Sequence, residues 1–292
     1  MRWMADVALV GNALMPQNIV ITGATSGIGE VAALHLAQSG ARIILVARSA
    51  ERAKATLSRL KVINPHVEHR AYLADLSSIA EMKRVAAEIL STEPVIDVLI
   101  NNVGAVYMDD TLTADGLAPT FATNHLAYYV LTLMLLPTLR ASPHARIICT
   151  SSRAHRYAKL DFNNLQRNGI LGYAQSKLMN LLFTRRLAQL LKDEPITINA
   201  FHPGFVATRF ADNTNLLWRM LMQIRKKLFG LTPEQGAKTL IHLAESSEIT
   251  ATGGYFVDCK LQEPAIHAGS DTEALHLWKL SAELTEVDFP LI

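Results

Sequence analysis

The chain has 292 residues, of which half are apolar and 18% are charged, a composition that suits a globular protein with a large core and excludes a disordered one. The formal net charge of +2, from 28 basic and 26 acidic residues, gives no support to binding of nucleic-acid phosphates. The two cysteines, Cys149 and Cys259, are too few for a disulfide framework or a metal cluster, and we expect a reducing, cytoplasmic setting.

Residues 1–17 are predicted to form an N-terminal extension ahead of the first strand. Asp6 and Asn12 interrupt their apolar residues, and the first apolar run begins at Asn18 or Ile19, so we expect no cleavable secretory signal. No run in the chain reaches the ~18 apolar residues that a membrane span requires. We therefore expect a soluble protein.

Short apolar runs alternate along the chain with longer segments of helical period. The short runs predict strands at 19–21, 42–47, 67–73, 98–101, 146–150, 197–201 and 255–258. The longer segments predict helices near 28–38, 50–59, 78–90, 120–139, 173–191 and 233–244. Such alternation predicts a parallel sheet covered on both faces, and hence one doubly wound α/β Rossmann domain over residues 18–292, with a mostly seven-stranded parallel sheet.

The first predicted strand leads into a glycine-rich turn, Thr22-Gly-Ala-Thr-Ser-Gly-Ile-Gly29, that opens a helical segment. Glycine allows a tight bend and a close approach of a pyrophosphate, whose charge the free N–H groups of the helix N-terminus would bind. Any tight strand-to-helix turn could use such glycines, but the position after the first strand favours a dinucleotide site. The candidate binding residues are Thr22, Gly23, Ser26, Gly27, Ile28 and Gly29.

The end of the second predicted strand reads Leu45-Val-Ala-Arg-Ser49. An NAD site usually presents an acidic side chain there for the ribose 2′-hydroxyl, whereas this chain has Ala47 followed by Arg48. A guanidinium suits a 2′-phosphate through its charge and its fork geometry. Arg48 is therefore either a solvated loop residue or an NADP-selecting one, and we favour NADP(H) over NAD(H).

Tyr173 and Lys177 are four residues apart in a predicted helix, so their side chains lie on the same face. A phenol is a poor acid or base at neutral pH, but an adjacent ammonium stabilises its phenolate and lowers its pKa. A Tyr-x-x-x-Lys pair is common and often structural. Its meaning here depends on the motifs around it.

Those motifs, taken in order, resemble the classical short-chain dehydrogenase/reductase family. Besides the glycine turn and the Tyr173–Lys177 pair, they are Asp75-Leu76, Asn101-Asn-Val-Gly104, Asn124 in Thr123-Asn-His-Leu, Ser152 in Thr150-Ser-Ser, and Pro203-Gly-Phe-Val-Ala-Thr208. Val103 replaces the family's alanine. The resemblance implies that Asn124, Ser152, Tyr173 and Lys177 are catalytic. It also implies cofactor contacts from Asp75, Leu76, Asn102, Gly104, Tyr173, Lys177, Pro203, Gly204, Val206 and Thr208.

The roles implied by the resemblance are specific. Tyr173 would donate or accept the substrate proton, Ser152 would bind the substrate oxygen, and Lys177 would lower the tyrosine pKa and bind the nicotinamide ribose. Asn124 would hold a water that links Lys177 to solvent. Ser152 is preferred over Ser151 by its register from the strand end, although Tyr173 follows it by 21 residues, a longer interval than in the simplest members.

The long interval resembles the retinol dehydrogenase-like branch of the family. Similar segments are Ser152-Arg-Ala-His155, Phe162-Asn-Asn-Leu-Gln166, Tyr255-Phe-Val-Asp-Cys259 and Leu277-Trp-Lys-Leu-Ser281. The resemblance implies an NADP(H)-dependent oxidoreductase acting on a small lipophilic carbonyl or alcohol. The alternative is a catalytically silent NADP(H)-binding sensor or scaffold of the same fold, which would have no need of all four catalytic residues.

A helical substrate lid is predicted at about 209–232, where Leu216–Phe229 carries large apolar side chains. Ordinary core packing explains this segment as well as a lipophilic substrate does. Arg225, Lys226 and Lys227 beside Trp218 add a third reading, peripheral contact with a membrane. The apolar segment 128–139 fits either a homodimer interface or burial within the monomer.

Neither metal chemistry nor hydrolase chemistry has a sequence motif in this chain. His125, His155 and His202 are scattered without the spacing of metal ligands, so we expect them to be packing or surface residues. No Gly-x-Ser-x-Gly surrounds Ser151 or Ser152, which argues against a hydrolase.

Overall fold

The computed structural model describes residues 16–204 and 231–289. The strands are β1 (Asn18–Thr22), β2 (Arg42–Ala47), β3 (Arg70–Leu73), β4 (Val98–Asn101), β5 (Ala145–Thr150), β6 (Ile196–His202), β7 (Tyr255–Val257) and β8 (Lys260–Gln262). The α-helices are α1 (Gly27–Gln38), α2 (Ala50–Ile63), α3 (Ile79–Thr92), α4 (Pro119–Phe121), α5 (Ala127–Met134), α6 (Leu136–Arg140), α7 (Gly169–Leu190), α9 (Pro233–Glu245) and α10 (Asp271–Thr285). Shorter helical segments are η1 (Ala122–Leu126), η2 (Arg153–Tyr157) and η4 (Ile266–Gly269).

All eight strands belong to one sheet in the order β3-β2-β1-β4-β5-β6-β7-β8. Strands β1 to β7 are parallel, with Ile19 opposite Ile43 on one side and opposite Val98 on the other. The order reverses between β1 and β4, so the predicted doubly wound α/β fold is confirmed. One short strand adds to the seven predicted, because β8 pairs antiparallel with β7.

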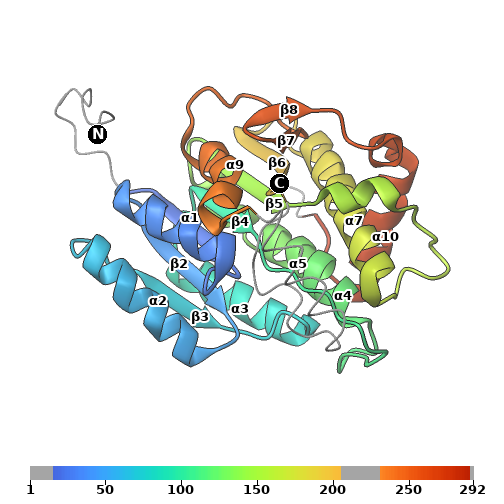
Figure 1. Ribbon diagram of the computed structural model, residues 1–292, viewed down its shortest axis with the longest axis horizontal. Coiled ribbons are helices and arrows are strands. Elements are labelled where there is room, and N and C mark those ends of the chain that lie inside the picture. The colour runs from blue at the N-terminus through green and yellow to red at the C-terminus, as the bar shows by residue number, and fades with distance from the viewer. Residues whose placement is uncertain (1–15, 205–230, 290–292) are drawn as a thin grey trace.

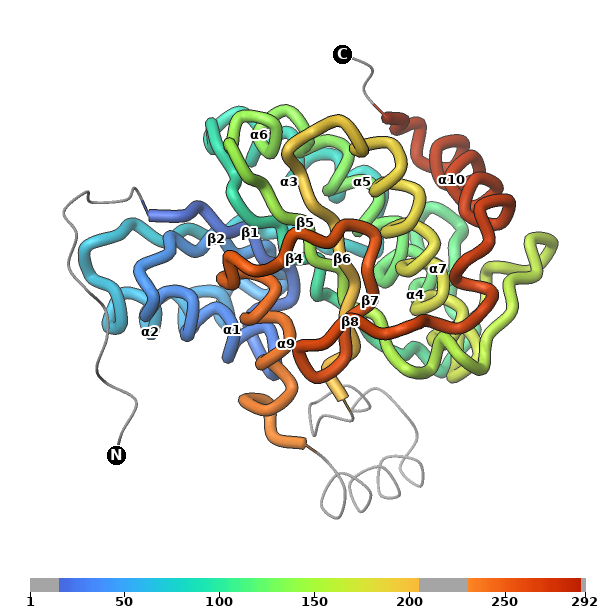
Figure 2. Tube along the Cα trace, turned by 90° about the horizontal axis from the view of Figure 1, so that it is seen from above, coloured from blue at the N-terminus to red at the C-terminus, as the bar shows by residue number. Residues whose placement is uncertain are grey.

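Helices cover both faces of the sheet (Figure 1). Figure 2 shows α1, α2 and α9 on one side of the strands, α3, α5 and α7 on the other, and α10 outside α7. Each face buries its own apolar cluster, one with α1 and α9 and the other with α3, α5, α7 and α10. Since both faces are buried, the strands are continuous apolar runs such as Ile43–Val46, all at most 1% exposed, rather than alternating ones.

Several sequence predictions of element boundaries were wrong. Helix α2 continues to Ile63 rather than ending at 59, and α7 begins at Gly169 rather than at 173. Strand β3 begins at Arg70 rather than at residue 67. The predicted helix at 120–139 is broken into α4, the π-helical segment η1, α5 and α6. Pro137 explains the break between α5 and α6, because it has no N–H to continue the helical hydrogen bonds. The π-turn at η1, with Ala127 N bonded to Ala122 O, has no signal in the hydrophobic period.

Burial within the chain accounts for the apolar helix that suggested a homodimer. Every residue of α5 from Ala127 to Leu133 is buried. Helix α10 covers this region, with the Trp278 ring 5.0 Å from that of Tyr129 and 6.0 Å from that of Phe183, centroid to centroid. Helix α5 therefore leaves no apolar face for a second subunit among the described residues, and the homodimer stays a prediction without support from it.

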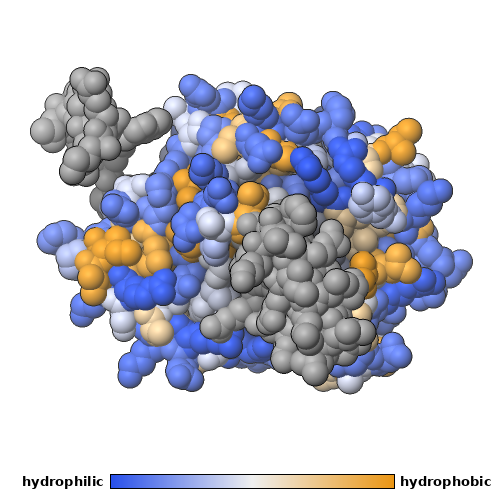
Figure 3. All heavy atoms as spheres, viewed as in Figure 1, coloured by the Kyte–Doolittle hydropathy of each residue, from blue (hydrophilic) through white to orange (hydrophobic). Residues whose placement is uncertain are grey.

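The described surface facing the viewer in Figure 3 is mostly hydrophilic, with apolar side chains in small separate groups. In the described ranges, no helix combines the length and the apolar character that a bilayer crossing requires. The segment proposed for peripheral membrane contact and most of the predicted lid lie outside the described residues.

Candidate active site

The candidate residues gather at the carboxyl ends of neighbouring parallel strands. Because the strands are parallel, the segments that follow them all emerge at one edge of the sheet, where ligands bind in open α/β folds. The residues placed there by their strands are Thr22 and Gly23 (β1), Arg48 (β2), Asp75 (β3), Asn102 and Gly104 (β4), Ser152 (β5), and Pro203 and Gly204 (β6).

The turn between β1 and α1 needs its glycines for two different reasons. Gly23 and Gly27 have φ angles of +68° and +61°, in the left-handed region that favours glycine. A Cβ on Gly23 would come within 2.9 Å of Val103 Cα. A Cβ on Gly29 would overlap the side-chain nitrogen of Asn102. The glycines thus let the turn pack directly against the segment after β4.

Thr22 and Asn102 join the ends of β1 and β4. The Thr22 hydroxyl accepts hydrogen bonds from the main-chain N–H groups of Asn102 (2.9 Å) and Val103 (3.0 Å). In return, the Asn102 side-chain nitrogen donates to the main-chain oxygens of Thr22 (3.0 Å) and Gly23 (3.1 Å). This network fixes the glycine turn. It engages the Thr22 hydroxyl and the Asn102 side-chain nitrogen, whereas the buried Asn102 Oδ1 has no partner among the described residues.

The start of α1 fits the pyrophosphate of a dinucleotide. Ser26 precedes the helix in extended conformation, and its side chain makes no capping hydrogen bond. The first N–H groups of α1 are thus free of a side-chain cap, and a helix N-terminus favours an anion through these groups and its dipole.

Arg48 and Asp75 flank the expected adenosine end of the site. Arg48 directly follows β2, is exposed, and makes no ion pair with the other described residues. Asp75 is exposed and accepts hydrogen bonds from the main-chain N–H (3.1 Å) and the hydroxyl (2.8 Å) of Ser77, while Leu76 is buried. The Arg48 guanidinium is thus available to an anion at this end of the sheet.

Tyr173 lies in the first turns of α7, and its side chain contacts that of Ser152, which follows β5. Burial raises the pKa of the Tyr173 phenol to about 12, and a hydrogen bond with the Ser152 side chain acts in the opposite direction. The Ser152 hydroxyl also accepts from the main-chain N–H of Ala154 at 3.2 Å, because Ser152 caps η2. The structure thus brings together the two hydroxyls that the sequence assigned to substrate chemistry.

Lys177 lies one turn after Tyr173, and its side chain is enclosed. Only 1% of the residue is exposed, and its ammonium donates to the Thr150 main-chain oxygen at 3.0 Å. The Nζ atom is 5.5 Å from the centroid of the Tyr173 ring and 5.7 Å from that of Tyr128. Burial lowers the pKa of the Lys177 ammonium to about 7. Gly104 makes room for it, since a Cβ there would lie 3.3 Å from Nζ.

Asn124 occupies the π-helical segment η1 and is fully buried. Its Oδ1 accepts from Ala105 N (2.9 Å), and its Nδ2 donates to Ala105 O (2.9 Å) and to the Ser176 hydroxyl (3.1 Å). Both amide hydrogens are therefore engaged in holding the segment after β4 against α7. A water at Asn124 stays a prediction, and it would have to bind Oδ1 or the main chain.

The adjacent serines Ser151 and Ser152 differ in accessibility. Ser151 is 1% exposed, and its hydroxyl donates to Lys177 O at 2.8 Å. Ser152 is half-buried and faces Tyr173. Pro203 and Gly204 follow β6 at the same edge, with Gly204 at a φ of +84°. Val206 and Thr208 lie outside the described residues.

Comparison with known proteins assigns the family. The profile described as "short chain dehydrogenase" matches residues 17–216, which is more than half of the chain. The chain belongs to this family. Among curated relatives of this short-chain dehydrogenase, retinol dehydrogenase 14 of Mus musculus is 35% identical over 282 residues, covering 91% of this chain and 84% of the relative. Retinol dehydrogenase 11 of Homo sapiens is 35% identical over 272 residues, with 91% and 85% covered. The predicted family and its retinol dehydrogenase-like branch are thereby confirmed.

Solved structures share the fold of this short-chain dehydrogenase. A putative uncharacterized protein from Mycobacterium Paratuberculosis is 29% identical, with a TM-score of 0.74 and coverage of 94% of this chain and 95% of that one. The Pseudomonas aeruginosa RhlG/NADP active-site complex is 26% identical, with a TM-score of 0.65 and coverage of 87% and 95%. The chain is thus an oxidoreductase of this family by similarity in both sequence and fold.

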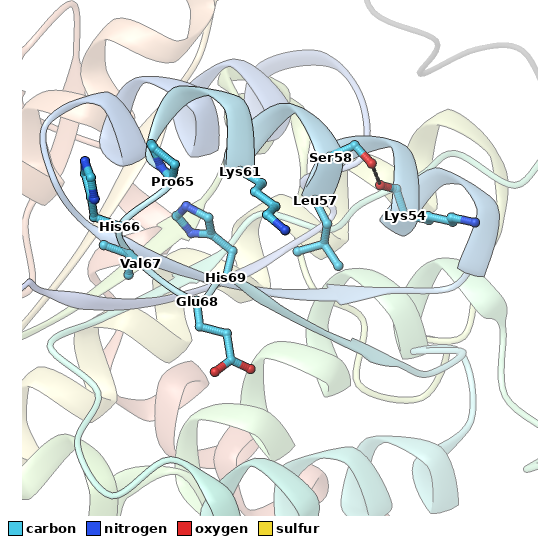
Figure 4. A pocket seen from close by; sticks show the side chains of 9 residues that line it. All are labelled: Lys54, Leu57, Ser58, Lys61, Pro65, His66, Val67, Glu68 and His69. Carbon is cyan, nitrogen blue, oxygen red and sulfur yellow. Dashed lines mark hydrogen bonds between the residues drawn. The ribbon is translucent and has the colours of Figure 1, made fainter.

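A cavity of about 550 Å³ lies away from the candidate catalytic residues of this short-chain dehydrogenase (Figure 4). Its walls are the side of α2 that carries Lys54 and Lys61, and the segment Pro65–His69 that leads into β3. This segment enters the amino end of β3, whereas the candidate site lies at the carboxyl ends of the strands. Cavity size alone therefore does not identify the active site here.

Sequence reasoning missed several groups that hold the candidate catalytic residues of the short-chain dehydrogenase in place. The main-chain oxygen of Thr150 holds Lys177 and also accepts from Asn180 Nδ2 at 3.1 Å. Ser176 anchors Asn124, and its own hydroxyl donates to Tyr173 O at 2.8 Å. Asn180 lies three residues after Lys177 on the same helix face, so the helical period could have found it. The main-chain oxygen has no signal in the sequence.

Proposed function

We propose that the chain is an NADP(H)-dependent oxidoreductase that transfers a hydride between the nicotinamide and a lipophilic carbonyl or alcohol, with Tyr173 as general acid and base. The main observation behind this proposal is that three side chains lie close together where β5 ends. The Tyr173 phenol hydrogen-bonds the Ser152 hydroxyl, and the Lys177 ammonium lies 5.5 Å from the tyrosine ring centroid.

In carbonyl reduction, Tyr173 donates its phenolic proton to the substrate oxygen, which the Ser152 hydroxyl orients by a hydrogen bond. In alcohol oxidation the same phenol, as phenolate, accepts that proton. A pKa of about 12 in the buried phenol is too high for efficient transfer at neutral pH, so Tyr173 depends on a neighbouring positive charge to lower it. Lys177 supplies that charge in its ammonium form.

Lys177 is placed to act through its charge as well as by binding. Its ammonium is fixed by the Thr150 carbonyl and faces the rings of Tyr173 and Tyr128, so the charge is screened by little water. Nearby hydroxyls of a bound ribose would give the ammonium further acceptors and favour its charged form. Positioned acid–base catalysis of this kind contributes ~10²–10⁴-fold to rate.

NADP(H) fits the residues at the carboxyl edge of the sheet. The glycine turn and the start of α1 would hold the pyrophosphate, Arg48 the 2′-phosphate, Asp75 and Leu76 the adenine, and Lys177 the nicotinamide ribose. The cofactor supplies or accepts the hydride. The Pseudomonas aeruginosa RhlG/NADP complex supports this choice for a related chain, and the exposed guanidinium of Arg48 supports it for this one.

A lipophilic substrate is supported by the relatives, whose names specify retinol dehydrogenases. Retinol is a long apolar alcohol, and a pocket for such a molecule is lined mainly by apolar side chains. The segment predicted to cover the site, at about 209–232, carries large apolar side chains between Leu216 and Phe229.

The decisive experiment compares Tyr173→Phe with Tyr157→Phe in assays of aldehydes, ketones and alcohols with both nicotinamide cofactors. Each variant loses one phenol oxygen, but Tyr157 is 85% exposed on η2. We expect Tyr173→Phe to lose ~10²-fold or more in kcat while binding NADPH normally. Tyr157→Phe should retain the parental rate.

Two results would contradict the proposal. Undiminished turnover by Tyr173→Phe would remove the tyrosine from the chemistry. Failure of the parent chain to turn over any substrate of the panel, with NADPH bound at normal affinity, would favour the silent sensor or scaffold.

A further inference from the structure

His155 lies three residues after Ser152 and is completely buried. It belongs to η2, and its ring packs edge-on against that of Tyr255 in β7, with 5.1 Å between centroids and 80° between planes. The proposed mechanism assigns this histidine no role. Its two ring nitrogens are nevertheless both in contact with main-chain groups.

Those two contacts define which nitrogen carries the proton. Nδ1 is 2.5 Å from the main-chain oxygen of Ser152, and Nε2 is 3.0 Å from the main-chain N of Ala265. A peptide N–H can only donate and a carbonyl oxygen can only accept. Nε2 must therefore accept from Ala265, and Nδ1 must carry the hydrogen that it donates to Ser152. The ring is the neutral Nδ1–H tautomer.

The groups around His155 favour this neutral form. Burial lowers the pKa of the imidazole, and the positive charge of Arg156 acts in the same direction, whereas the bond to Ser152 opposes them. His202, from β6, lies on the other side of the serine segment and accepts from the main-chain N of Arg153 at 3.3 Å. Burial lowers its pKa to about 4, so it too is uncharged near neutral pH. The charge that acts on His155 is that of Arg156, and the charge of Arg153 acts on the neighbouring His202.

The contacts hold one short peptide segment from several sides. The Ser152 carbonyl is fixed by His155, the next N–H is fixed by His202, and the Ser152 hydroxyl accepts from Ala154 N. The same η2 segment is attached to the chain after β8, through Ala265 N and through Arg156, whose guanidinium donates to Glu263 O at 2.6 Å. The direction of the Ser152 hydroxyl toward Tyr173 thus depends on main-chain geometry that the His155 ring helps to determine.

We propose that His155 is a positioning residue for the reaction: its Nδ1–H holds the Ser152 carbonyl and thereby aims the Ser152 hydroxyl at Tyr173 and the substrate oxygen. This inference rests on the proposed function, because it gives a role to a group that supports the catalytic serine. A displacement of about 1 Å in such a group costs about 10²-fold in rate. The effect should appear in kcat rather than in cofactor binding, since His155 does not touch the glycine turn or Arg48.

Three substitutions separate the two hydrogen bonds of the ring. In His155→Asn, the amide nitrogen takes the place of Nδ1 and can still donate to Ser152 O, but the contact with Ala265 is lost. In His155→Gln, the amide oxygen reaches the place of Nε2 and can accept from Ala265 N. The side-chain donor to Ser152 O is lost, and only the main-chain N–H of residue 155, at 3.1 Å, still donates to that oxygen. His155→Phe removes both bonds and keeps a ring against Tyr255.

The measurements are kcat and KM for the carbonyl or alcohol substrate, Kd for NADPH, and the thermal midpoint of each variant. We expect His155→Asn to keep kcat within about threefold of the parent, and the Gln and Phe variants to lose about 10²-fold. All three should bind NADPH with unchanged Kd. A purely structural histidine would instead lower the thermal midpoints of the Asn and Gln variants alike and leave kcat of the folded fraction unchanged. That pattern would overturn the proposal.

Nitrogen NMR of histidine-labelled protein gives a readout independent of turnover. The signal that disappears in His155→Asn should show a protonated Nδ1 and an unprotonated Nε2. The opposite tautomer, or a doubly protonated ring at pH 7, would overturn the assignment. The Tyr173→Phe variant tests the proposed function separately from the positioning role of His155. If it abolishes turnover while the Gln and Phe variants retain kcat, the positioning role fails and the proposed function stands.

Discussion

The ammonium of Lys177 donates a 3.0 Å hydrogen bond to the main-chain oxygen of Thr150 although only 1% of the lysine is exposed. The same oxygen accepts from Asn180 Nδ2 at 3.1 Å. No carboxylate contributes to the bonds that hold this ammonium among the described residues, and burial lowers its pKa to about 7. A buried cation without a counterion destabilises a fold. Burial of this lysine therefore costs stability, and its proposed catalytic role gives a reason for its position.

Replacing Lys177 by methionine should stabilise the fold most below pH 7. At such pH the folded chain holds a buried ammonium, whereas methionine fills similar space without charge, and Thr150 O keeps its bond from Asn180. We expect the free energy of unfolding to rise by roughly 1–4 kcal/mol at pH 6. Between pH 7 and about 10.4 the unfolded parent binds one proton more than the folded parent at this site, so the parent gains stability as the pH rises. The difference in the free energy of unfolding between Lys177→Met and the parent should therefore become smaller as the pH rises from 7 to 9.

Urea denaturation of the parent and Lys177→Met at pH 6 and pH 9 measures this difference. Lys61→Met is the control, because Lys61 is exposed in the last turn of α2. We expect the control to change stability by less than about 0.5 kcal/mol at either pH. If Lys177→Met lowers the free energy of unfolding at pH 6, or raises it equally at both pH values, the buried charge is not the main destabilising effect of Lys177.

Arg48→Ala should weaken NADPH binding far more than NADH binding. The 2′-phosphate is the only group that distinguishes the two cofactors, and a charge-assisted hydrogen bond to it is worth about 1.5–3 kcal/mol. We expect Kd for NADPH to rise about 10- to 100-fold and Kd for NADH to change by less than about twofold. Titration calorimetry of the variant with both cofactors provides the measurement.

Lys61→Ala is the matched control for the loss of charge, since it lies about 16 Å along α2 from the residues beside Arg48. It should leave both dissociation constants unchanged. If Arg48→Ala loses NADPH and NADH affinity equally, Arg48 does not bind the 2′-phosphate. It would then be a solvated loop residue.

The sequence predicted the sheet and the edge where the site lies because both depend on local patterns. Buried runs such as Ile43–Val46 are recognisable in a single segment, and Thr22, Arg48 and Ser152 follow strand ends directly. The family resemblance then followed from the order in which the motifs occur along the chain.

What the sequence could not predict involves contacts between distant segments. Trp278 of α10 covers Tyr129 of α5 across 149 positions of the chain, which is why the apolar segment 128–139 also resembled a subunit interface. The π-turn that carries Asn124 depends on its bonds to Ala105 and Ser176. Hydrophobic period contains no information about such bonds, and main-chain acceptors such as Thr150 O are not encoded by side-chain identity.

Glu93→Gln should strongly destabilise the fold. Glu93 is 2% exposed and accepts from Arg42 Nη1 at 2.5 Å and from Tyr72 at 2.8 Å, joining β2, β3 and the end of α3. Burial by itself would raise the pKa of this carboxyl, but the hydrogen bonds from Arg42 and Tyr72 outweigh it, so the pKa is lowered. Removing one partner of a buried pair costs about 3–5 kcal/mol.

The pH dependence gives a second readout of the Glu93 carboxylate. Because its folded pKa is lowered, its contribution is fully present above the unfolded value of about 4.3 and is lost as the pH falls through the folded pKa. Urea denaturation at pH 7 should show the full loss in Glu93→Gln, and the gap to the parent should narrow in more acidic buffer. Glu81→Gln is the control, because Glu81 pairs with Arg84 on the surface of α3. A loss no larger than that of the control would contradict the prediction.

Gly172→Ala should impair catalysis through the backbone next to Tyr173. Gly172 is buried in the first turn of α7, and a Cβ there would overlap the main-chain oxygen of Arg167. Either the segment before α7 or the helix itself must move, and Tyr173 is the next residue. Overpacking costs about 1–3 kcal/mol, and a shift of about 1 Å in the phenol lowers kcat about 10²-fold.

Gly269→Ala is the control, since nothing lies within 4 Å of a Cβ at that position. Steady-state kinetics at saturating cofactor should show the loss only in Gly172→Ala. If that variant keeps the parental kcat, the start of α7 can adjust without moving the phenol, and the position of Tyr173 does not depend on this contact.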